Sequence, residues 1–429
     1  MNYFEEPFKR IISPVRHPIP VKSSIEARKC TDFSLKSYDN LELKGEYFLI
    51  DKDFPWIVYS HSLGSNRSEG RSLVPLSEHK KFNLCLYDSR ASGLSQGENI
   101  TFGQREKNDL LFILVFLNRT LFMRKVMLWG RSIGCNCVLQ LIYAIFTHEP
   151  SSLKSRGMSI NFLAKECLIK NQTRTINDDI EDKNNYIRTL MFSFISRNPK
   201  YITPSGSSSF TVICIILDSP YQSISTFVSD NIKNYSYGVQ LIVGKLLLEL
   251  FQDFCVKKFK VDPSAQQNEV LVPVIDLATL FIYSSDDNLI PKSRFLSLIN
   301  KFSSKKKKSR ALSLEIEEGH SQRRSSGTSE KIFTAIQSLM DNSSVFEVRI
   351  AHFEKHHSSQ SKTFIKTFNS SNTLRSKTPS TQPLTITNQS RPPNKGHLSP
   401  IPIQDEPQYI KTYNKIIPQS LKKPKSLFK

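Results

Sequence analysis

The stretch Val126–Phe146, VMLWGRSIGCNCVLQLIYAIF, places one serine between two glycines at the point where one apolar pattern gives way to another. The run that ends at Gly130 is typical of a buried strand, and the run after Ser132 is typical of a helix. A chain that passes so quickly from strand to helix must turn sharply, and glycines at 130 and 134 let the two elements pass close together. The stretch therefore predicts either a reactive serine on a strained turn or a small residue in a tight connection.

The segments around this stretch alternate between strand-like and helix-like patterns. Buried strands are predicted at 55–60, 82–88 and 125–130, and helical patterns at 68–81 and 103–119. Strands that alternate with helices form a mostly parallel sheet covered by helices on both faces. Residues 30–49 alternate polar and apolar side chains and predict an antiparallel hairpin at one edge of the sheet.

The alternation is interrupted once and then resumes. Residues 148–209 are rich in Ser, Asn, Lys and Thr, which favours a low-complexity, disordered insertion, although short helical patches such as 186–195 leave local order open. Strand patterns return at 210–220, 277–287 and 311–320, and a terminal helix is predicted at 325–342. We therefore expect one domain over 1–342. Residues 343–429 are rich in Ser, Thr, Pro and Lys and poor in aliphatic side chains, which predicts a disordered tail.

The formal charge of +20 raises nucleic acid and anionic membranes as partners. Residues 343–429 carry 14 Lys and Arg against 4 Asp and Glu, so half of the excess lies in the expected tail. The basic run Ser303–Arg310 is typical of a solvated loop, and no basic face interleaved with aromatic residues is evident. We therefore expect no specific binding to nucleic acid, and at most weak electrostatic contact of the tail with membranes or acidic proteins.

The amino-terminal residues include acidic side chains and lack the apolar core of a signal peptide. No uninterrupted apolar run approaches the roughly 20 residues of a membrane-spanning helix. Cys85, Cys135, Cys137 and Cys214 lie within apolar stretches, which indicates reduced core residues and not disulfides. The sequence therefore predicts a soluble cytoplasmic protein without a transmembrane segment, with peripheral attachment to membranes as an alternative.

A serine hydroxyl becomes a good nucleophile only beside a base, and that base needs a carboxylate to orient it. Asp287 and His320 each follow a late predicted strand, and the carboxyl ends of parallel strands meet at one edge of a sheet. Both are therefore expected near Ser132. Taken alone, Asp286 and Asp287 fit an ordinary turn, and His320 fits a solvated loop. His61 is the competing histidine, but it follows an earlier strand and better suits a loop that shapes an oxyanion hole.

Six segments together resemble the successive motifs of α/β-hydrolase-fold serine hydrolases: SHSLGSNRSEG, YDSRASGLSQGE, LWGRSIG, ILDSPYQS, SSDDNLIP and EEGH. The resemblance is strongest to the serine aminopeptidase S33-like or hydrolase-4-like branch, which includes relatives of the ABHD17 depalmitoylases. It implies an α/β-hydrolase fold with Ser132 as nucleophile, His320 as base and Asp287 as acid. It also implies an oxyanion hole formed by the backbone N–H groups of Leu63 and Ile133, and it calls for no metal and no organic cofactor.

The chain departs from the family pattern at two positions. Ser62 stands where the family usually has glycine, and a Cβ there is expected to narrow the oxyanion hole or to turn the N–H of Leu63 away. Ala91 stands where relatives often have glycine. Residues 237–259 have apolar side chains at helical spacing, which favours a packing helix; the alternative is a cap that accepts an acyl chain over the site.

The sequence thus predicts a serine hydrolase that cleaves an acyl ester or thioester of a small molecule or an acylated protein. Two alternatives stay open. One is a hydrolase-fold scaffold with weak or no catalysis, whose basic tail binds acidic partners or membrane surfaces. The other is an S33-like peptidase.

Overall fold

The computed structural model describes residues 2–146, 190, 193–194, 196–201, 209–233, 240–263, 267–275, 277–303, 311–341 and 346–349. Within these ranges the strands form one sheet in the order β1-β2-β4-β3-β5-β6-β7-β8, and β9 pairs with β6 off this path. The strands are β1 (Cys30–Lys36), β2 (Glu42–Phe48), β3 (Trp56–Ser60), β4 (Asn83–Tyr87), β5 (Lys125–Arg131), β6 (Ser209–Asp218), β7 (Thr279–Ser284), β8 (Ala311–Ile316) and β9 (Phe346–Arg349). The helices are α1 (Asn2–Ile12), α2 (Ser24–Lys29), η1 (Arg67–Leu73), α3 (Val74–His79), α4 (Glu106–Leu121), α5 (Ile133–Phe146), η2 (Pro199–Tyr201), α9 (Ile224–Lys233), α10 (Gln240–Phe259), α11 (Asn268–Leu271), η4 (Val272–Val274), α12 (Lys292–Ser303) and α13 (Ser326–Asp341).

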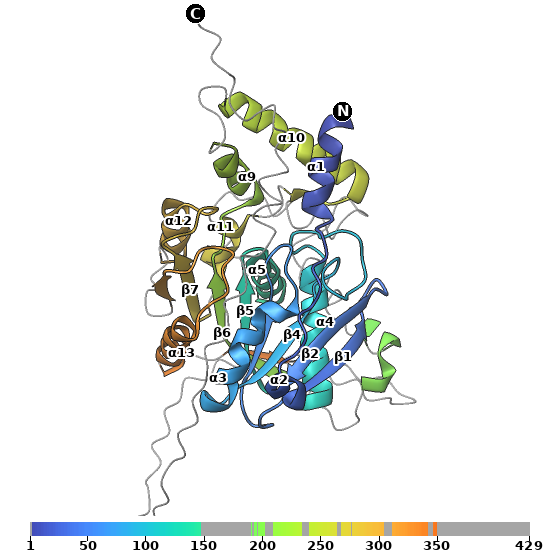
Figure 1. Ribbon diagram of the computed structural model, residues 1–429, viewed down its shortest axis with the longest axis vertical. Helices are drawn as coiled ribbons and strands as arrows, with labels where there is room; N and C mark the ends of the chain where they lie inside the picture. Colours follow the sequence, from blue (N-terminus) through green and yellow to red (C-terminus); the bar gives the residue numbers. More distant parts are fainter. Residues whose placement is uncertain are drawn as a thin grey trace, which may run out of the picture. The chain divides into compact units, whose positions relative to one another are not determined.

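The sheet begins with an antiparallel hairpin and continues as parallel strands. β1 and β2 form the predicted hairpin, with Cys30 opposite Phe48, and β2 also pairs antiparallel with β4. Every pair from β4 through β3, β5, β6 and β7 to β8 is parallel. This strand order, with helices in the connections, is that of the α/β-hydrolase fold (Figure 1). The predicted fold class is therefore confirmed.

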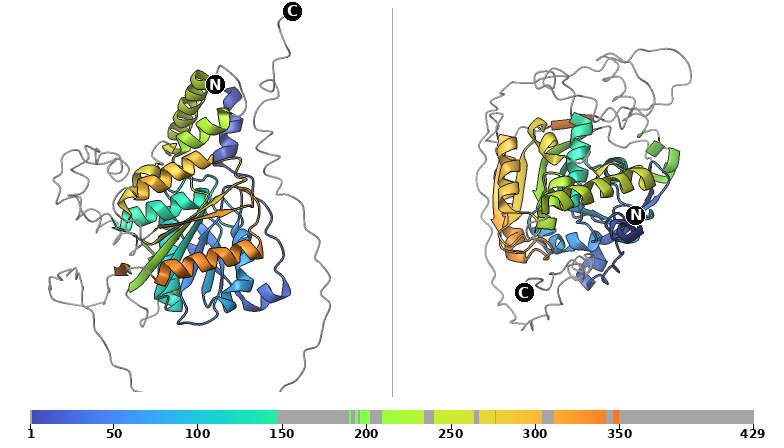
Figure 2. Two further views of the ribbon diagram at one scale, coloured as in Figure 1. Left: turned by 90° about the vertical axis from the view of Figure 1, so that its left-hand side faces the viewer. Right: turned by 90° about the horizontal axis from the view of Figure 1, so that it is seen from above.

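Helices cover both faces of the sheet, as the alternating sequence pattern predicts (Figure 2). α4, α5 and α12 contribute to the larger apolar core on one face, and η1, α3 and α13 contribute to the core on the other. α4 is buried at every residue from Leu110 to Leu117, which explains why its second half is apolar on all sides. β5 lies between β3 and β6, so the turn that follows β5 is fixed by a strand on each side.

A third apolar cluster lies near the carboxyl ends of the central strands, where α1 and α10 pack together (Figure 1). The ring of Phe8 on α1 lies 5.2 Å from that of Phe251 and 5.8 Å from that of Phe254, both on α10. Leu63 and Ile133 also pack against this cluster. A helix is therefore confirmed at 240–259, and it contributes to the cluster against which the expected oxyanion residues pack. Whether α10 also accepts an acyl chain stays a prediction. Among the helices that the structure describes, none combines the length and apolar character needed to cross a membrane.

The cysteines predicted to be reduced core residues are buried. Cys85, Cys135, Cys137 and Cys214 carry free thiols. Burial raises the pKa of each of them, so these thiols stay protonated and unreactive near neutral pH. They are therefore packing residues, as expected.

Part of the segment predicted as a disordered insertion, 148–209, is built into the fold. Phe194 is buried in the larger core, and its ring meets the ring of Phe112 at right angles, 5.4 Å away. The side chain of Asn198 accepts from the N–H of Lys36 and donates to the carbonyl of Lys36, both at 2.8 Å, and so covers the edge of β1. The local order that the sequence left open in this segment is present at these residues: Phe194 joins the core, and Asn198 covers part of the exposed edge of β1. Most of the remaining segment lies outside the described residues.

One strand, β9, lies inside the segment 343–429 that the sequence predicts as a disordered tail, so the ordered part of the chain extends beyond residue 342. β9 pairs antiparallel with β6, with Phe346 opposite Val212. β7 pairs with β6 only from Ile215 onward, so without β9 the first half of β6 would present an open edge. The other residues of the predicted tail lie outside the described part of the chain.

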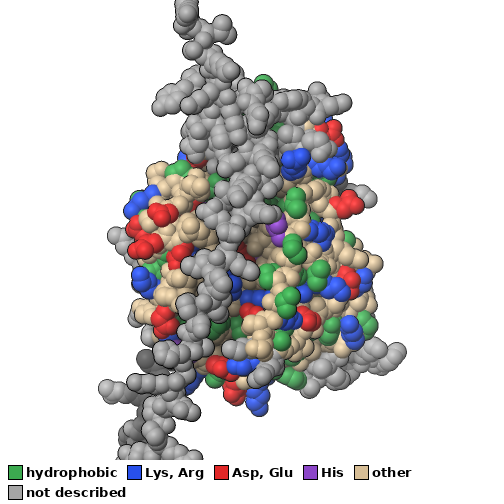
Figure 3. Space-filling model, viewed as in Figure 1, with side chains coloured by type: hydrophobic (Ala, Val, Ile, Leu, Met, Phe, Trp, Pro, Cys, Tyr) green, Lys and Arg blue, Asp and Glu red, His purple; other side chains and the backbone are tan. Residues whose placement is uncertain are grey.

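Acidic and basic side chains of the described residues are interspersed on the face seen in Figure 3. Some form ion pairs between elements, such as Lys80 with Glu330 and Lys29 with Glu78. The excess positive charge assigned to 343–429 lies outside the described residues. Its contact with membranes or acidic proteins therefore stays a prediction.

Candidate active site

Ser132 occupies the sharp turn between β5 and α5. Its φ is +52°, in the left-handed region that costs an L-residue energy. Its N–H donates a 2.8 Å hydrogen bond to the carbonyl of Asp218 on β6, and its carbonyl accepts from the N–H of Cys135 at 3.0 Å. These two bonds hold the backbone of the turn in its unfavourable conformation.

The two glycines of the turn are required by sterics. A Cβ on Gly134 would lie 2.1 Å from the carbonyl oxygen of Ser60, and a Cβ on Gly130 would lie 2.5 Å from the carbonyl oxygen of Gly134. Both contacts are with backbone atoms that cannot move aside cheaply. The spacing of the G-x-S-x-G pattern therefore follows from how closely α5 approaches β3 and β5.

The structure brings the three predicted side chains together. His320 Nε2 lies 2.9 Å from Ser132 Oγ, and His320 Nδ1 lies 2.7 Å from Asp287 Oδ2. A carboxylate can only accept hydrogen bonds, so Nδ1 carries the ring proton and Nε2 accepts from the hydroxyl of Ser132. Ser132 is 7% exposed and His320 is 5% exposed, so little water competes for these bonds.

The loop after β7 directs Asp287 toward the imidazole. Its Oδ1 accepts from the N–H groups of Leu289 at 2.9 Å and Ile290 at 2.8 Å, while Oδ2 faces His320. Burial opposes ionisation, but the electrostatic attraction of His320 and these hydrogen bonds outweigh it, so the pKa of Asp287 lies below its usual value. Asp287 is therefore a turn residue, and the turn itself orients its carboxylate. The neighbouring Asp286 is exposed.

Leu63 and Ile133 line one small cavity, which also has His61, Ser62 and Ser89 in its wall. Ile133 directly follows Ser132 and is the first residue of α5, where the helix dipole favours negative charge. The two residues expected to stabilise an oxyanion therefore border one common cavity.

Ser62 is held in place by Glu69 of η1. Its N–H donates to Oε2 of Glu69 at 2.8 Å, and its hydroxyl donates to Oε1 at 2.7 Å. The neighbouring His61 accepts the N–H of Ser89 at Nε2, at 3.0 Å, so its ring proton lies on Nδ1, which donates to the carbonyl of Ser62 at 2.8 Å. Both ring nitrogens of His61 therefore help to fix the loop at residues 61–63. The hydroxyl of Ser62 adds a hydrogen bond to Glu69 that a glycine at this position could not make.

Asp218 and Arg324 support the loop that carries His320. Asp218 is fully buried at the end of β6 and accepts from Arg324 Nη2 at 2.6 Å and Nε at 3.2 Å. Burial opposes ionisation, yet the charges of Arg324 and Arg131 keep the pKa of Asp218 below its usual value. Arg324 Nη1 donates to the carbonyls of Glu318 and Gly319, directly before His320. Nothing in the local sequence pattern indicates a pairing between residues so far apart in the chain.

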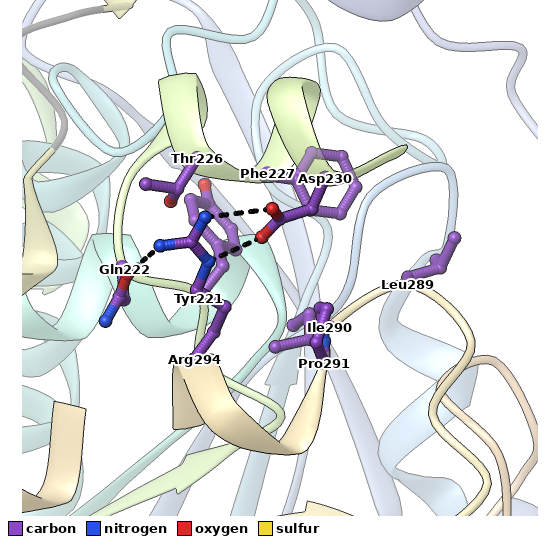
Figure 4. A pocket seen from close by; sticks show the side chains of 9 residues that line it. All are labelled: Tyr221, Gln222, Thr226, Phe227, Asp230, Leu289, Ile290, Pro291 and Arg294. Atoms are coloured by element: carbon purple, nitrogen blue, oxygen red, sulfur yellow. Dashed lines mark hydrogen bonds and ion pairs between the residues drawn. The ribbon is translucent and has the colours of Figure 1, made fainter. Parts of the chain in front are cut away.

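A second small cavity lies beside the Asp287 loop, between α9 and the start of α12 (Figure 4). The charged Arg294 is part of its wall, but Nε and Nη2 donate to Asp230, at 2.8 Å and 2.9 Å, and Nη1 donates to Oε1 of Gln222 at 3.5 Å. The cavity is lined by Tyr221, Gln222, Thr226, Phe227, Asp230, Leu289, Ile290, Pro291 and Arg294. Because the guanidinium is already paired, the apolar side chains are the groups that this cavity offers to a ligand.

Within the described residues, Cys30, Asp32 and Glu46 are grouped closely enough to resemble a metal site. Lys22 Nζ lies 2.8 Å from Asp32, and Arg71 donates to Glu46 through two bonds of 2.7 Å and 2.9 Å. These cations already neutralise the carboxylates, and burial raises the pKa of the Cys30 thiol. The group is therefore better described as an ion-pair network than as a metal centre.

No protein-family model matches the sequence, and no curated protein matches it. Among solved structures, the chain is similar to an esterase of Pyrococcus furiosus, at 14% identity and a TM-score of 0.48, over 77% of this chain and 97% of the esterase. It is also similar to a putative hydrolase of Agrobacterium vitis, at 12% identity and a TM-score of 0.43, over 72% of this chain and 98% of the other. An esterase of Exiguobacterium antarcticum gives 12% identity and a TM-score of 0.40, with the same coverage of 72% and 98%.

The strand order and the turn at Ser132 define a protein of the α/β-hydrolase fold. Assignment to the S33-like branch stays a prediction.

Proposed function

We propose that the protein is a serine hydrolase that cleaves acyl esters or thioesters. The observation that carries this proposal is the hydrogen-bonded chain from Ser132 Oγ through His320 to Asp287, with contacts of 2.9 Å and 2.7 Å. A serine in this arrangement has a base within reach of its proton, and the base has a carboxylate that fixes its tautomer.

The reaction follows from this geometry. Ser132 Oγ attacks the acyl carbonyl carbon while His320 Nε2 takes the hydroxyl proton, and Asp287 stabilises the imidazolium that forms. His320 then gives the proton to the leaving oxygen or sulfur, which leaves an acyl group on Ser132. Water, deprotonated by His320, attacks this acyl-enzyme; the bond to Ser132 Oγ breaks, His320 returns the proton to Oγ, and the acid is released. The low pKa of Asp287 keeps its carboxylate ionised throughout.

The oxyanion of each tetrahedral intermediate is assigned to the N–H groups of Leu63 and Ile133. Both residues line one cavity, and Ile133 directly follows Ser132 and opens α5. Donors that point at the developing charge, together with a helix N-terminus, favour the transition state over the ground state.

The surroundings of the serine favour an apolar acyl group. Leu63 and Ile133 pack against a cluster that includes Phe102, Ile224 and Phe251, drawn from loops, α9 and α10. A site that borders such an apolar cluster favours a substrate with a hydrocarbon acyl chain, whether it is attached to a small molecule or to a protein.

A fluorophosphonate probe tests the proposal, because it reacts only with an activated serine. We expect labelling of the wild type and none of Ser132→Ala or His320→Ala. The matched controls are Ser285→Ala and His79→Ala, which change exposed residues outside the site and should be labelled like the wild type. Folded wild-type protein that takes no label would contradict catalysis and favour the scaffold alternative. A panel of acyl esters, thioesters and amides then defines the bond that is cleaved, and preference for the amides would favour a peptidase.

A further inference from the structure

Arg131 is the residue directly before Ser132, and its side chain is 2% exposed. Its Nη2 donates to the carbonyl of His320 at 2.9 Å and to the carbonyl of Gln322 at 2.6 Å. One guanidinium nitrogen therefore binds the backbone of the base on both sides of Ser321. The backbone that carries the imidazole therefore cannot shift without breaking these bonds.

The other terminal nitrogen of the Arg131 guanidinium contacts Glu69, which holds residues 61–63, called here the oxyanion loop. Arg131 Nη1 lies 3.2 Å from Oε1 of Glu69, whose side chain is 10% exposed. Glu69 in turn accepts both the N–H and the hydroxyl of Ser62, at 2.8 Å and 2.7 Å. Ser62 directly precedes Leu63, so the position of the Leu63 peptide is tied to Arg131 through a single carboxylate.

From these contacts we propose that Arg131 and Glu69 are positioning residues that hold the base and the oxyanion loop in register with the nucleophile. The inference rests on the proposed serine hydrolase function. It assigns the hydroxyl of Ser62 a role that a glycine could not fill, namely a second donor to Glu69. It also explains why a long, charged side chain occupies the interior next to the nucleophile, where a planar fork of donors can bind carbonyls and a carboxylate together.

The test uses Arg131→Lys and Glu69→Gln in the full chain. Lysine keeps the charge of Arg131 but cannot reach the carbonyls and the carboxylate at once. Arg71→Lys is the matched control: Arg71 is buried, donates in the same two-pronged way to Glu46, and lies on the same helix η1 as Glu69. It therefore reports any general disturbance of that helix or of buried arginines.

Two measurements are made on each variant: kcat and KM for an acyl ester, and backbone hydrogen exchange of peptides that cover 61–63 and 318–322. For Arg131→Lys we expect kcat to fall about 10²-fold with KM nearly unchanged, because a small displacement of reacting groups has an effect of that size. Exchange should rise in both peptides. For Glu69→Gln we expect a smaller fall in kcat and faster exchange in 61–63 alone. Arg71→Lys should resemble the wild type in both measurements.

The inference is overturned if Arg131→Lys leaves kcat and the exchange of both peptides unchanged, or if exchange rises equally across the whole chain. It is also overturned if Arg71→Lys lowers kcat as much as Arg131→Lys. A wild type without turnover or labelling would refute the proposed function, and the hydrogen exchange of the two loops would still decide whether Arg131 links them. If Arg131→Lys fails to fold, Glu69→Gln decides the link to 61–63 through the same two measurements.

Discussion

The carbonyl of Asp218, at the end of β6, accepts the backbone N–H of Ser132 at 2.8 Å. The strained turn is thus held by the neighbouring strand, and the carboxylate of the same Asp218 binds Arg324, which supports the loop of His320. One residue of β6 therefore contacts the backbone of the nucleophile and, through Arg324, the backbone next to the base.

Replacing Gly134 with alanine is expected to destabilise the fold by about 1–3 kcal/mol or more, because its Cβ would lie 2.1 Å from the carbonyl oxygen of Ser60. Thermal or urea unfolding measures the change. Gly327→Ala is the control, since a Cβ there meets no atom within 4 Å and α13 should gain roughly 0.5–1 kcal/mol of helix propensity. Equal stability of Gly134→Ala and the wild type would contradict the close approach of α5 to β3.

Asp287→Asn is expected to lower kcat about 10³–10⁴-fold while the protein stays folded, because an amide cannot stabilise the imidazolium and can favour the wrong tautomer. Its remaining carbonyl oxygen can still accept from Leu289 and Ile290, so the loop should persist. Asp286→Asn, at the exposed neighbour, should leave kcat unchanged. Steady-state kinetics of both variants checks the assignment, and a similar loss in both would place the acid elsewhere.

Asp218 and Asp287 should give the protein an acid-sensitive stability. The pKa of each is below its usual value in the folded state, so the unfolded chain binds these protons more tightly. The unfolded chain has a carboxyl pKa of about 4, and above that pH the two groups make their full contribution to the free energy of unfolding. This contribution is lost as the pH falls from about 4 toward the lower pKa of the folded state. Urea unfolding between about pH 6 and pH 3 measures this dependence.

Asp218→Asn should flatten that pH dependence and cost about 3–5 kcal/mol at neutral pH, because two buried guanidiniums lose a counter-ion. An unchanged slope in the variant would show that other carboxylates cause the acid lability.

Phe251→Ala should change which acyl chain lengths are preferred more than it changes the rate of the catalytic step. Phe251 is 2% exposed and packs between Phe8 and Phe102, in the cluster against which Leu63 and Ile133 pack. We expect kcat/KM to fall more for long-chain than for short-chain esters, because the apolar wall loses contact area. Leu246→Ala, at an exposed position of the same helix, is the control. A uniform fall across chain lengths would mean that α10 does not contact the acyl group.

Phe194→Ala is expected to cost about 3–5 kcal/mol, because the ring is fully buried against Phe112. Urea unfolding measures the loss, with Phe122→Ala at a partly exposed position as the comparison. An unchanged free energy of unfolding in Phe194→Ala would contradict the burial of this ring and favour disorder of the segment 148–209.

The sequence predicted the parallel sheet, the hairpin and α10 because hydrophobic periodicity reports burial directly. It also singled out Ser132, Asp287 and His320, because each follows an apolar run. It left local order around Phe194 open, and it missed β9, which covers a sheet edge that only the assembled fold creates. It missed Arg131, Glu69 and Arg324 for a related reason: charged residues are usually exposed, and only the tertiary structure shows that these are nearly buried and paired.

The ion pairs around the base have a consequence for selectivity by charge. Arg131 and Arg324 carry two positive charges, and Glu69 and Asp218 carry two negative ones, so the group is electrically neutral as a whole. A neutral quartet exerts only a short-range field, which neither attracts nor repels an approaching ion strongly. Discrimination between anionic and cationic leaving groups must therefore originate in side chains outside this quartet.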